Sequence, residues 1–352
     1  MPKRYLFFIS LSYSYSILRP LQKAIRKRGD EVVWFLTKGC PNWLMDDEIL
    51  LETIAEAQSY NPTAVFAPGN YIYDFIPGVK VAVFHGYPVG KRGEKQAEKL
   101  DDHFTIREWF DIYCTQGESS TSVFQNIAKN LAFFKTYETG WCKVDPFFTP
   151  LEKEFDTSST AKTILYSPTF SKGISSVETL FDTIKILSKK REWNWIITFH
   201  PKITDPKVIA NYQTLAQECN NVSFEANKGL TTFQRADIML CDSSSIIMEF
   251  MLLNKPVVTF RNTNPGPHLL DVQNEEEIEG ALNLALMNPP ELIKNITEYT
   301  HFHESHRDGC NSKRVLEAVD HYTENYQGKI KRKPLNLIRK IKQRFNAGYY
   351  HW

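Results

Sequence analysis

An acidic, hydroxyl-rich turn stands between an apolar strand and an apolar helix in ADIMLCDSSSIIMEFMLLNKP, residues Ala236–Pro256. Asp242 ends the predicted strand Ile238–Cys241, and three serines follow where the helix begins: Ser243, Ser244 and Ser245. Their hydroxyl groups and the first unpaired backbone N–H groups of the helix can all face one anion. The stretch therefore predicts a phosphate-binding turn.

Two histidines each follow a predicted strand, one in each half of the chain. Val79–Phe84 leads into His85 and Gly86, and Trp195–Phe199 leads into His200. A single histidine at a strand end is usually a core residue, but two in facing domains indicate one shared site. Gly86 allows a ligand to approach the backbone closely. Basic residues that can meet phosphate stand beside these histidines: Lys91, Arg92 and Lys202.

Two further polar segments are candidates for the same anion. The loop Tyr166–Gly173 contains Thr169, and the run Asp308–Val315 contains Arg314 just before a predicted helix. Taken alone, the first is an ordinary polar turn and the second an ordinary helix cap. We include Thr169 and Arg314 among the predicted donor-binding residues.

Strand-like and helix-like segments alternate along the whole chain, which predicts parallel sheets with helical crossovers. The 352 residues exceed what one hydrophobic core usually serves. We therefore predict an α/β protein with two doubly wound Rossmann-type domains facing across a cleft, residues 1–150 and 151–328. The linker is predicted near Asp145–Lys162. The expected strands are Tyr5–Ser10, Glu31–Leu36, Ala64–Ala67, Val79–Phe84, Ile112–Thr115, Thr163–Ser167, Trp195–Phe199, Val222–Phe224, Ile238–Cys241 and Pro256–Phe260.

The net charge of +1 conceals a basic tail, residues 329–352. This tail carries eight Lys or Arg and no Asp or Glu, whereas the other residues hold 34 basic and 41 acidic groups. Apolar residues recur in it at helical spacing. An amphipathic cationic helix of this kind binds an anionic membrane surface. The alternative is a helix packed on the protein with solvated charges. Nucleic acid is a weaker alternative, because the body is acidic, and we predict no nucleic-acid partner.

Several other classes of protein and site are disfavoured by the sequence. No apolar run approaches the roughly 20 residues of a membrane span. A signal peptide at the N-terminus is disfavoured because Ser and Tyr interrupt the apolar run, and the six scattered cysteines are typical of a reduced cytosolic protein. The histidines His301, His303 and His306 lack nearby Cys or paired acids, so we predict a solvated loop, no metal ion and no other cofactor.

The order of the motifs resembles the CDP-glycerol glycerophosphotransferases of teichoic-acid and capsule synthesis. The similar segments run from about residue 80 to 316: HGYPVGKRGE (His85–Glu94), ETGWCKVD (Glu138–Asp145), LYSPTF (Leu165–Phe170), FHPK (Phe199–Lys202), ADIMLCDSSSIIMEFMLLNKPVVTF (Ala236–Phe260) and DGCNSKRV (Asp308–Val315). Each motif is weak by itself. Together they are fairly specific.

The resemblance implies a GT-B-like enzyme at the cytoplasmic face of the membrane, with a CDP-alcohol donor and a lipid-linked or polymeric glycan acceptor. By position, His85 matches the family's general base and His200 its second essential histidine, while Asp242, Ser244 and Ser245 match its donor-binding turn. Two departures matter. Cys142-Lys143 stands where the family commonly has Pro-Arg, and Ser243 stands where it usually has Tyr. The second departure leaves the donor's base or alcohol open.

Two other functions stay compatible with the sequence. A nucleotide-sugar glycosyltransferase or a UDP-sugar 2-epimerase has the same fold and similar strand-end residues. A membrane-associated binding protein with a degenerate, inactive site is the other alternative.

Overall fold

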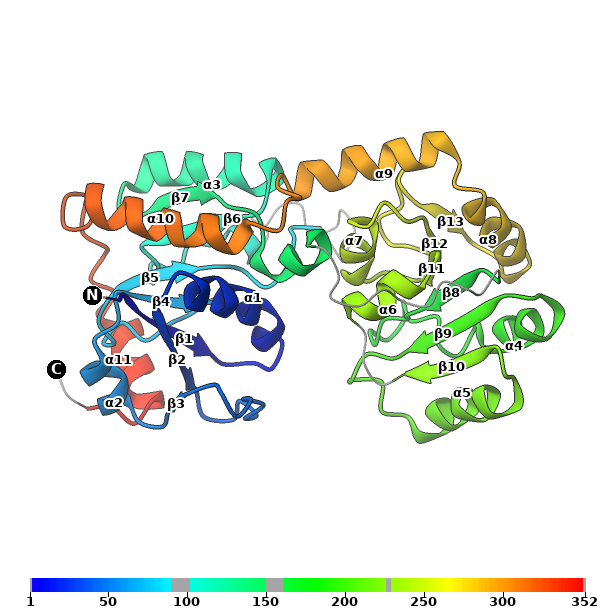
Figure 1. Ribbon diagram of the computed structural model, residues 1–352, viewed down its shortest axis with the longest axis horizontal. Coiled ribbons are helices and arrows are strands. Elements are labelled where there is room, and N and C mark those ends of the chain that lie inside the picture. The colour runs from blue at the N-terminus through cyan, green and yellow to red at the C-terminus, as the bar shows by residue number, and fades with distance from the viewer. Residues whose placement is uncertain (1, 90–101, 150–160, 226–228, 351–352) are drawn as a thin grey trace. The chain divides into compact units, whose positions relative to one another are not determined.

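The computed structural model describes residues 2–89, 102–149, 161–225 and 229–350 (Figure 1). They form two compact units. Unit 1 takes the described residues of Met1–Pro88, Leu100–Thr149 and Phe302–Trp352, and unit 2 takes those of Val89–Lys99 and Pro150–His301. Of the described helices, none is long and apolar enough to cross a bilayer.

Unit 1 is built on a parallel sheet with the order β3-β2-β1-β4-β5-β6-β7. Its strands are β1 (Arg4–Ile9), β2 (Glu31–Leu36), β3 (Leu50–Leu51), β4 (Ala64–Ala67), β5 (Val79–Ala82), β6 (Ile112–Thr115) and β7 (Lys135–Glu138). Its helices are α1 (Ser14–Lys27), α2 (Ile54–Tyr60), η2 (Asp102–Phe104), α3 (Glu118–Leu131), η3 (Cys142–Phe148), α10 (Asn311–Asn325) and α11 (Leu337–Asn346).

Alternate residues of β1 serve the two faces of this sheet, as expected for a strand buried on both sides. Phe8 packs with Phe35 and Ala57 toward α2 and α3. Phe7 packs edge to face on Trp34, whose indole N–H donates to Gln22 of α1 at 2.7 Å. Helices therefore cover both faces of the sheet (Figure 1).

Unit 2 repeats this plan with six parallel strands in the order β10-β9-β8-β11-β12-β13. The strands are β8 (Thr163–Tyr166), β9 (Asn194–Thr198), β10 (Val222–Glu225), β11 (Ile238–Cys241), β12 (Val257–Phe260) and β13 (Leu270–Val272). The helices are α4 (Phe181–Lys190), α5 (Pro206–Glu218), α6 (Leu230–Arg235), α7 (Ile246–Met251), η4 (Glu275–Glu277), α8 (Ile278–Leu286) and α9 (Pro290–His303), of which the last two residues are assigned to unit 1.

The C-terminal part of the chain differs from the predicted division into residues 1–150, 151–328 and 329–352. From Phe302 onward the described chain belongs to unit 1. The reason is packing, since α10 contacts α1 and η3 and lies against β5, β6 and β7. The tail also packs on unit 1 through α11, where Gln343 donates to the carbonyl of Ile72 at 2.8 Å.

Candidate active site

His85 stands on a strained turn just after β5. Its neighbour Phe84 has φ of 56°, a left-handed conformation that a bulky residue rarely adopts. Packing holds it there, because the ring of Phe84 stacks on His103 at 4.9 Å and its carbonyl accepts from the indole of Trp141 at 3.3 Å. Such conformations cost about 1–3 kcal/mol and cluster at functional sites. The turn leaves the side chain of His85 exposed.

The ring of His85 is oriented by two contacts within unit 1. It stacks on Tyr13 with 5.3 Å between ring centroids, and its Nδ1 lies 3.2 Å from the carbonyl oxygen of Pro68. A carbonyl can only accept, so Nδ1 carries the proton and Nε2 of the neutral ring carries the lone pair. This tautomer suits a general base acting through Nε2.

Gly86 does not need to be glycine for its own backbone. Its φ is not positive, and a Cβ added there would meet nothing within 4 Å. Its carbonyl accepts from the side chain of Gln116 at 2.8 Å. The close approach of a ligand to Gly86 stays a prediction.

A buried carboxyl group, that of Glu304, holds together the residues near the His85 turn. It accepts from the hydroxyl of Tyr87 at 2.9 Å, the backbone N–H of Trp141 at 3.1 Å and the side chain of Asn311 at 3.1 Å. Burial raises the pKa of Glu304 to about 8. Sequence reasoning missed this residue, since an isolated Glu among polar residues gives no sign of burial.

The segments Glu138–Asp145 and Asp308–Val315 meet in unit 1 because Asp145 of the first caps a helix that begins in the second. Asp145 accepts from the backbone N–H groups of Asn311 and Ser312 at 2.7 and 2.8 Å, so it caps the first turn of α10. Arg314 forms an ion pair with Asp308, which lowers the pKa of that carboxyl group to about 2. A contact between Arg314 and the donor stays a prediction.

In unit 2, Asp242 ties together the two loops at the point where the strand order reverses, between β8 and β11. Its side chain is fully buried. One carboxylate oxygen accepts from the backbone N–H of Thr169 at 2.8 Å, and the other accepts from the N–H and hydroxyl of Ser176 at 2.9 and 3.0 Å. Burial raises the pKa of Asp242, and these hydrogen bonds oppose the rise. Asp242 and Thr169 thus shape the turn from within.

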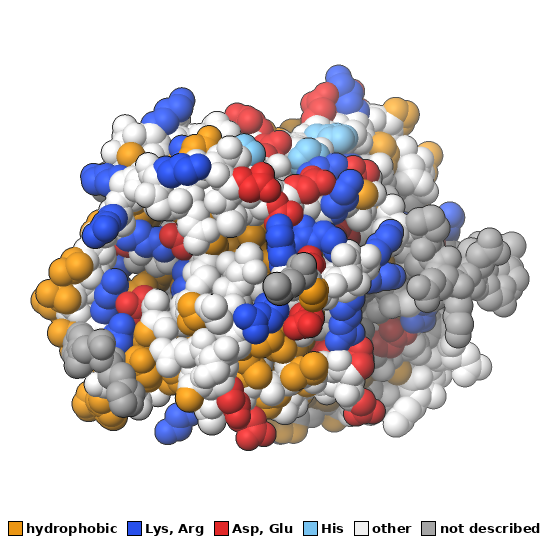
Figure 2. All heavy atoms as spheres, turned by 60° about the vertical axis from the view of Figure 1, so that its left-hand side comes forward, with side chains coloured by type: hydrophobic (Ala, Val, Ile, Leu, Met, Phe, Trp, Pro, Cys, Tyr) orange, Lys and Arg blue, Asp and Glu red, His pale blue; other side chains and the backbone are white. Residues whose placement is uncertain are grey.

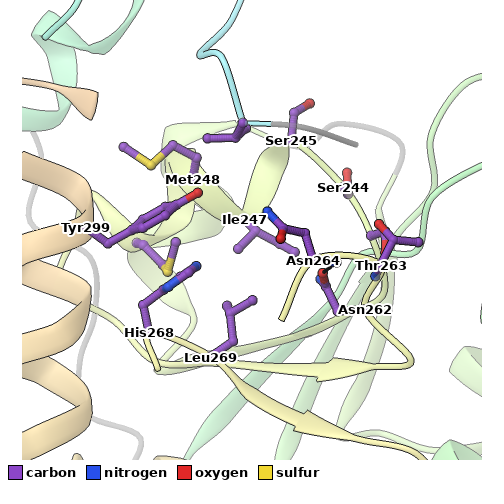
Figure 3. Close-up of a pocket in the computed structure, with 13 residues that line it drawn as sticks. Ser244, Ser245, Ile247, Met248, Asn262, Thr263, Asn264, His268, Leu269 and Tyr299 are labelled. Carbon is purple, nitrogen blue, oxygen red and sulfur yellow. Dashed lines mark hydrogen bonds between the residues drawn. The ribbon is translucent and has the colours of Figure 1, made fainter. Parts of the chain in front are cut away.

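The serines after Asp242 divide between structure and surface. Ser243 is buried, and its hydroxyl accepts from the backbone N–H of Thr263 at 2.8 Å. Ser244 and Ser245 are partly exposed and line a pocket that contains about 440 Å³ of space, its open mouth included (Figure 3). The helix that follows, α7, has only six residues. The anion-binding capacity of the turn therefore rests mainly on its hydroxyl and N–H groups.

The far side of this pocket carries an aromatic pair. His268 and Tyr299 stack with 3.6 Å between ring centroids and 9° between their planes, and Figure 3 shows them opposite Ser244. Burial lowers the pKa of His268 to about 4, so this ring is neutral at neutral pH. Tyr299 supplies aromatic surface in the pocket that Ser243, in place of the family's usual Tyr, does not.

Sequence reasoning missed the pocket residues that follow β12: Asn262, Thr263, Asn264 and His268. A signal was present, because the apolar run Pro256–Phe260 is followed by the polar segment RNTNPGPH. The same strand-end rule that selected His85 and His200 would have selected it.

His200 follows β9 and has the opposite tautomer to His85. The backbone N–H of Lys202 donates to its Nδ1 at 3.1 Å, so in the neutral ring Nε2 carries the proton and can donate. The ring packs on Phe170 at 4.3 Å, and the ammonium group of Lys202 lies 4.8 Å from the same phenyl ring. A donor beside a cation suits a phosphate oxygen.

Two predicted donor-binding residues, Lys91 and Arg92, lie outside the described residues. Among the residues that are described, no cluster of three His, Cys, Asp or Glu side chains could hold a metal ion. The segment with His301, His303 and His306 was predicted to be a solvated loop, but it is in part a helix, because α9 ends at His303. Nδ1 of His303 lies 2.8 Å from the hydroxyl of Ser119.

Two doubly wound α/β units with this strand order define a GT-B-like fold. The solved structures that share it include the following three. The wall teichoic acid polymerase TagF is 13% identical over 91% of this chain and 89% of its own, with a TM-score of 0.62. MnaA of S. aureus with UDP is 15% identical over 94% and 99%, with a TM-score of 0.60. A UDP-GlcNAc 2-epimerase from Neisseria meningitidis is 16% identical over 90% and 99%, with a TM-score of 0.57.

A family model described as "CDP-Glycerol:Poly(glycerophosphate) glycerophosphotransferase" matches residues 52–265, which is more than half of the chain. The protein belongs to this family of enzymes, as the motifs predicted. No curated protein matches the sequence.

Proposed function

We propose that the protein transfers a glycerol-phosphate, or a related polyol-phosphate, from a CDP-alcohol to a hydroxyl group of a lipid-linked or polymeric glycan acceptor. The observation that carries the proposal is the turn fixed by Asp242, which presents Ser244 and Ser245 to a pocket at the switch point of unit 2. Family membership supports the donor class.

In the proposed reaction, the acceptor oxygen attacks the phosphorus that bears the alcohol. Nε2 of His85 takes the hydroxyl proton as the new P–O bond forms. The bond between this phosphorus and the bridging oxygen breaks, and its electron pair leaves with CMP. Nε2–H of His200 and the ammonium group of Lys202 stabilise the charge on the donor's phosphate oxygens.

The aromatic pair of unit 2 supports a place for the nucleoside. His268 and Tyr299 lie in the same pocket as Ser244. The pair lines the pocket and offers aromatic surface to a nucleobase, while the serine hydroxyls can donate to the phosphates. We assign the donor's base to the aromatic side of the pocket and its diphosphate to the serine side.

The nucleotide released identifies the donor class. We expect CMP when CDP-glycerol or CDP-ribitol is supplied with a polyol-phosphate acceptor, measured by ion-exchange chromatography of the products. The second candidate is a UDP-sugar enzyme, which the fold of MnaA and of the 2-epimerase favours. UDP release, or epimerisation of a UDP-sugar without CMP release from any CDP-alcohol, would replace our proposal with this one.

We also propose that the enzyme works on an anionic membrane surface at the cytoplasmic face, and helix α11 supports this. The helix packs on unit 1 with its polar side. Lys340 and Arg344 each lie 3.5 Å from Asp74, and Gln343 is buried. Its apolar side chains are exposed: Leu337 at 53%, Ile338 at 73%, Ile341 at 45% and Phe345 at 69%.

An apolar helix face turned to solvent indicates an interaction surface. Leu335 and Tyr350 extend it at either end, and exposed basic residues flank it: Lys331, Arg332 and Lys342. Figure 2 turns this side of the molecule forward and shows hydrophobic side chains at the surface among Lys and Arg. The helix is therefore packed on the protein, as in one alternative for the tail, and still offers the apolar, cationic face that the membrane-binding alternative requires.

Replacing Ile338 and Phe345 with Glu should abolish most vesicle binding through this face. Inserting an apolar side chain into the interface gains roughly 1.5–3 kcal/mol when it is fully buried, and each Glu adds repulsion from anionic lipid. Co-sedimentation with vesicles of phosphatidylglycerol and phosphatidylcholine measures the effect, and we expect at least a tenfold loss, corresponding to about 1.4 kcal/mol. Ile186→Glu, at an exposed position of α4, is the matched control and should bind as the wild type does. Equal binding by all three proteins would refute the proposal.

A further inference from the structure

A groove in unit 1 runs between α11 and the carboxyl ends of β2 and β4. It contains about 1000 Å³ of space, open to solvent. Lys38 follows β2, Tyr71 and Tyr73 follow β4, and the opposite wall comes from Arg339 and Lys342 of α11. β4 pairs with β1 where the strand order of this sheet reverses, which is where doubly wound sheets bind ligands. The reaction as proposed above does not use this groove.

The lining of the groove suits an anionic chain with a carbon backbone. Three cations face it, Lys38, Arg339 and Lys342, and the described residues that line it include no acidic side chain. Arg339 lies over the ring of Trp109 at 5.8 Å, and its ion pair with Glu108 is long, at 3.8 Å. Cations bind phosphodiester oxygens, and aromatic faces accept the carbon atoms between them.

Contacts between aromatic rings connect the groove to His85 within unit 1. Tyr71 packs edge to face on Phe8 at 5.6 Å. It is also close enough to Tyr13 to raise the pKa of that phenol, after burial as the main cause. Tyr13 in turn stacks on the ring of His85 at 5.3 Å. A chain held in the groove can therefore extend past Tyr71 toward the base.

We infer that this groove binds the phosphodiester end of the acceptor and directs its terminal hydroxyl group toward His85. The inference rests on the proposed transferase function, and it adds the acceptor site. Neighbouring sides of α11 then have different partners, because the apolar face contacts lipid while Arg339 and Lys342, which border it, contact the acceptor. Such an arrangement keeps a lipid-linked acceptor beside the surface in which its lipid is anchored.

The test uses the full-length protein and a short soluble glycerol-phosphate oligomer, without donor and without lipid. Calorimetry should give a dissociation constant at least about tenfold higher for Lys38→Ala/Lys342→Ala than for the wild type, because each substitution removes a charge-assisted contact with phosphate. Lys189→Ala/Lys294→Ala removes two exposed lysines outside the groove and should bind as the wild type does. In turnover assays the groove variant should raise the KM for the oligomer and leave the KM for the donor unchanged.

Three results would overturn the inference. One is equal binding of the oligomer by the wild type and the groove variant. Another is equal binding of an uncharged polyglycerol of the same length, because recognition would then not depend on phosphate. The third is a variant that loses anionic vesicle binding but keeps oligomer binding, which would assign the lysines to lipid headgroups. The binding arm needs no donor, so an error in the donor class would leave its outcome unchanged.

Discussion

His85→Ala is expected to lower kcat by about two to four orders of magnitude, the usual contribution of a general base. The proton of the acceptor hydroxyl would have no acceptor at Nε2, while the donor pocket of unit 2 would be unaltered. The KM for the CDP-alcohol should therefore change little. CMP release at saturating donor and acceptor measures the effect.

His321→Ala is the control for this variant. His321 is an exposed histidine of unit 1 whose Nδ1 lies 2.9 Å from the hydroxyl of Tyr137, and its loss should not alter turnover. Full activity of His85→Ala would contradict the assigned role. If His85→Ala/His200→Ala also kept the biological activity of the wild type, a binding protein with an inactive site would be the better description.

Asp242→Ala is expected to lower the free energy of unfolding by roughly 3 kcal/mol or more. Three buried donors, the N–H of Thr169 and the N–H and hydroxyl of Ser176, would lose their acceptor, and each unsatisfied group costs about 1–3 kcal/mol. The same change should raise the KM for the donor, because the loop that contains Thr169 and Ser176 would no longer be joined to the serine turn. Urea unfolding monitored by tryptophan fluorescence measures the stability.

Asp182→Ala provides the comparison for this second variant. Asp182 is exposed in the first turn of α4, and its replacement should change stability by less than about 1 kcal/mol. If the urea midpoint of Asp242→Ala equalled that of the wild type, the carboxylate would not be holding the two loops together.

The parallel sheets could be predicted from the sequence because their strands are buried on both faces. Runs such as Tyr5–Ser10 and Ile238–Cys241 are almost continuously apolar, and the structure has β1 and β11 at these places. Position relative to strands also located His85, His200 and the turn after Asp242. The short strands β3, β7 and β13 were missed, since their residues are only partly buried and their pattern is weak.

The partners of side chains could not be predicted, because they come from distant parts of the chain. Asp242 was expected to contact the donor, but its acceptors are used by residues 66 and 73 positions away. Glu304 is buried only because Tyr87 and Trp141 are brought to it by the sheet of unit 1. Arg314 was expected at the donor, and Asp308 is its partner in the structure.

The return of the chain to unit 1 affects the order in which the protein can fold during synthesis. Most of unit 2, from Pro150 to His301, is inserted within the sequence of unit 1, and unit 1 is completed only by the residues from Phe302 onward. While these residues are still on the ribosome, β5, β6 and β7 lack the cover of α10. The carboxylate oxygens of Asp145, which accept from the first N–H groups of α10, then have no helix to cap. Unit 2 can form its core as soon as α9 has emerged. The sheet of unit 2, although it is synthesised second, is therefore the first that can become stable. A fragment ending near residue 150 would lack α10 and would not be an independent domain.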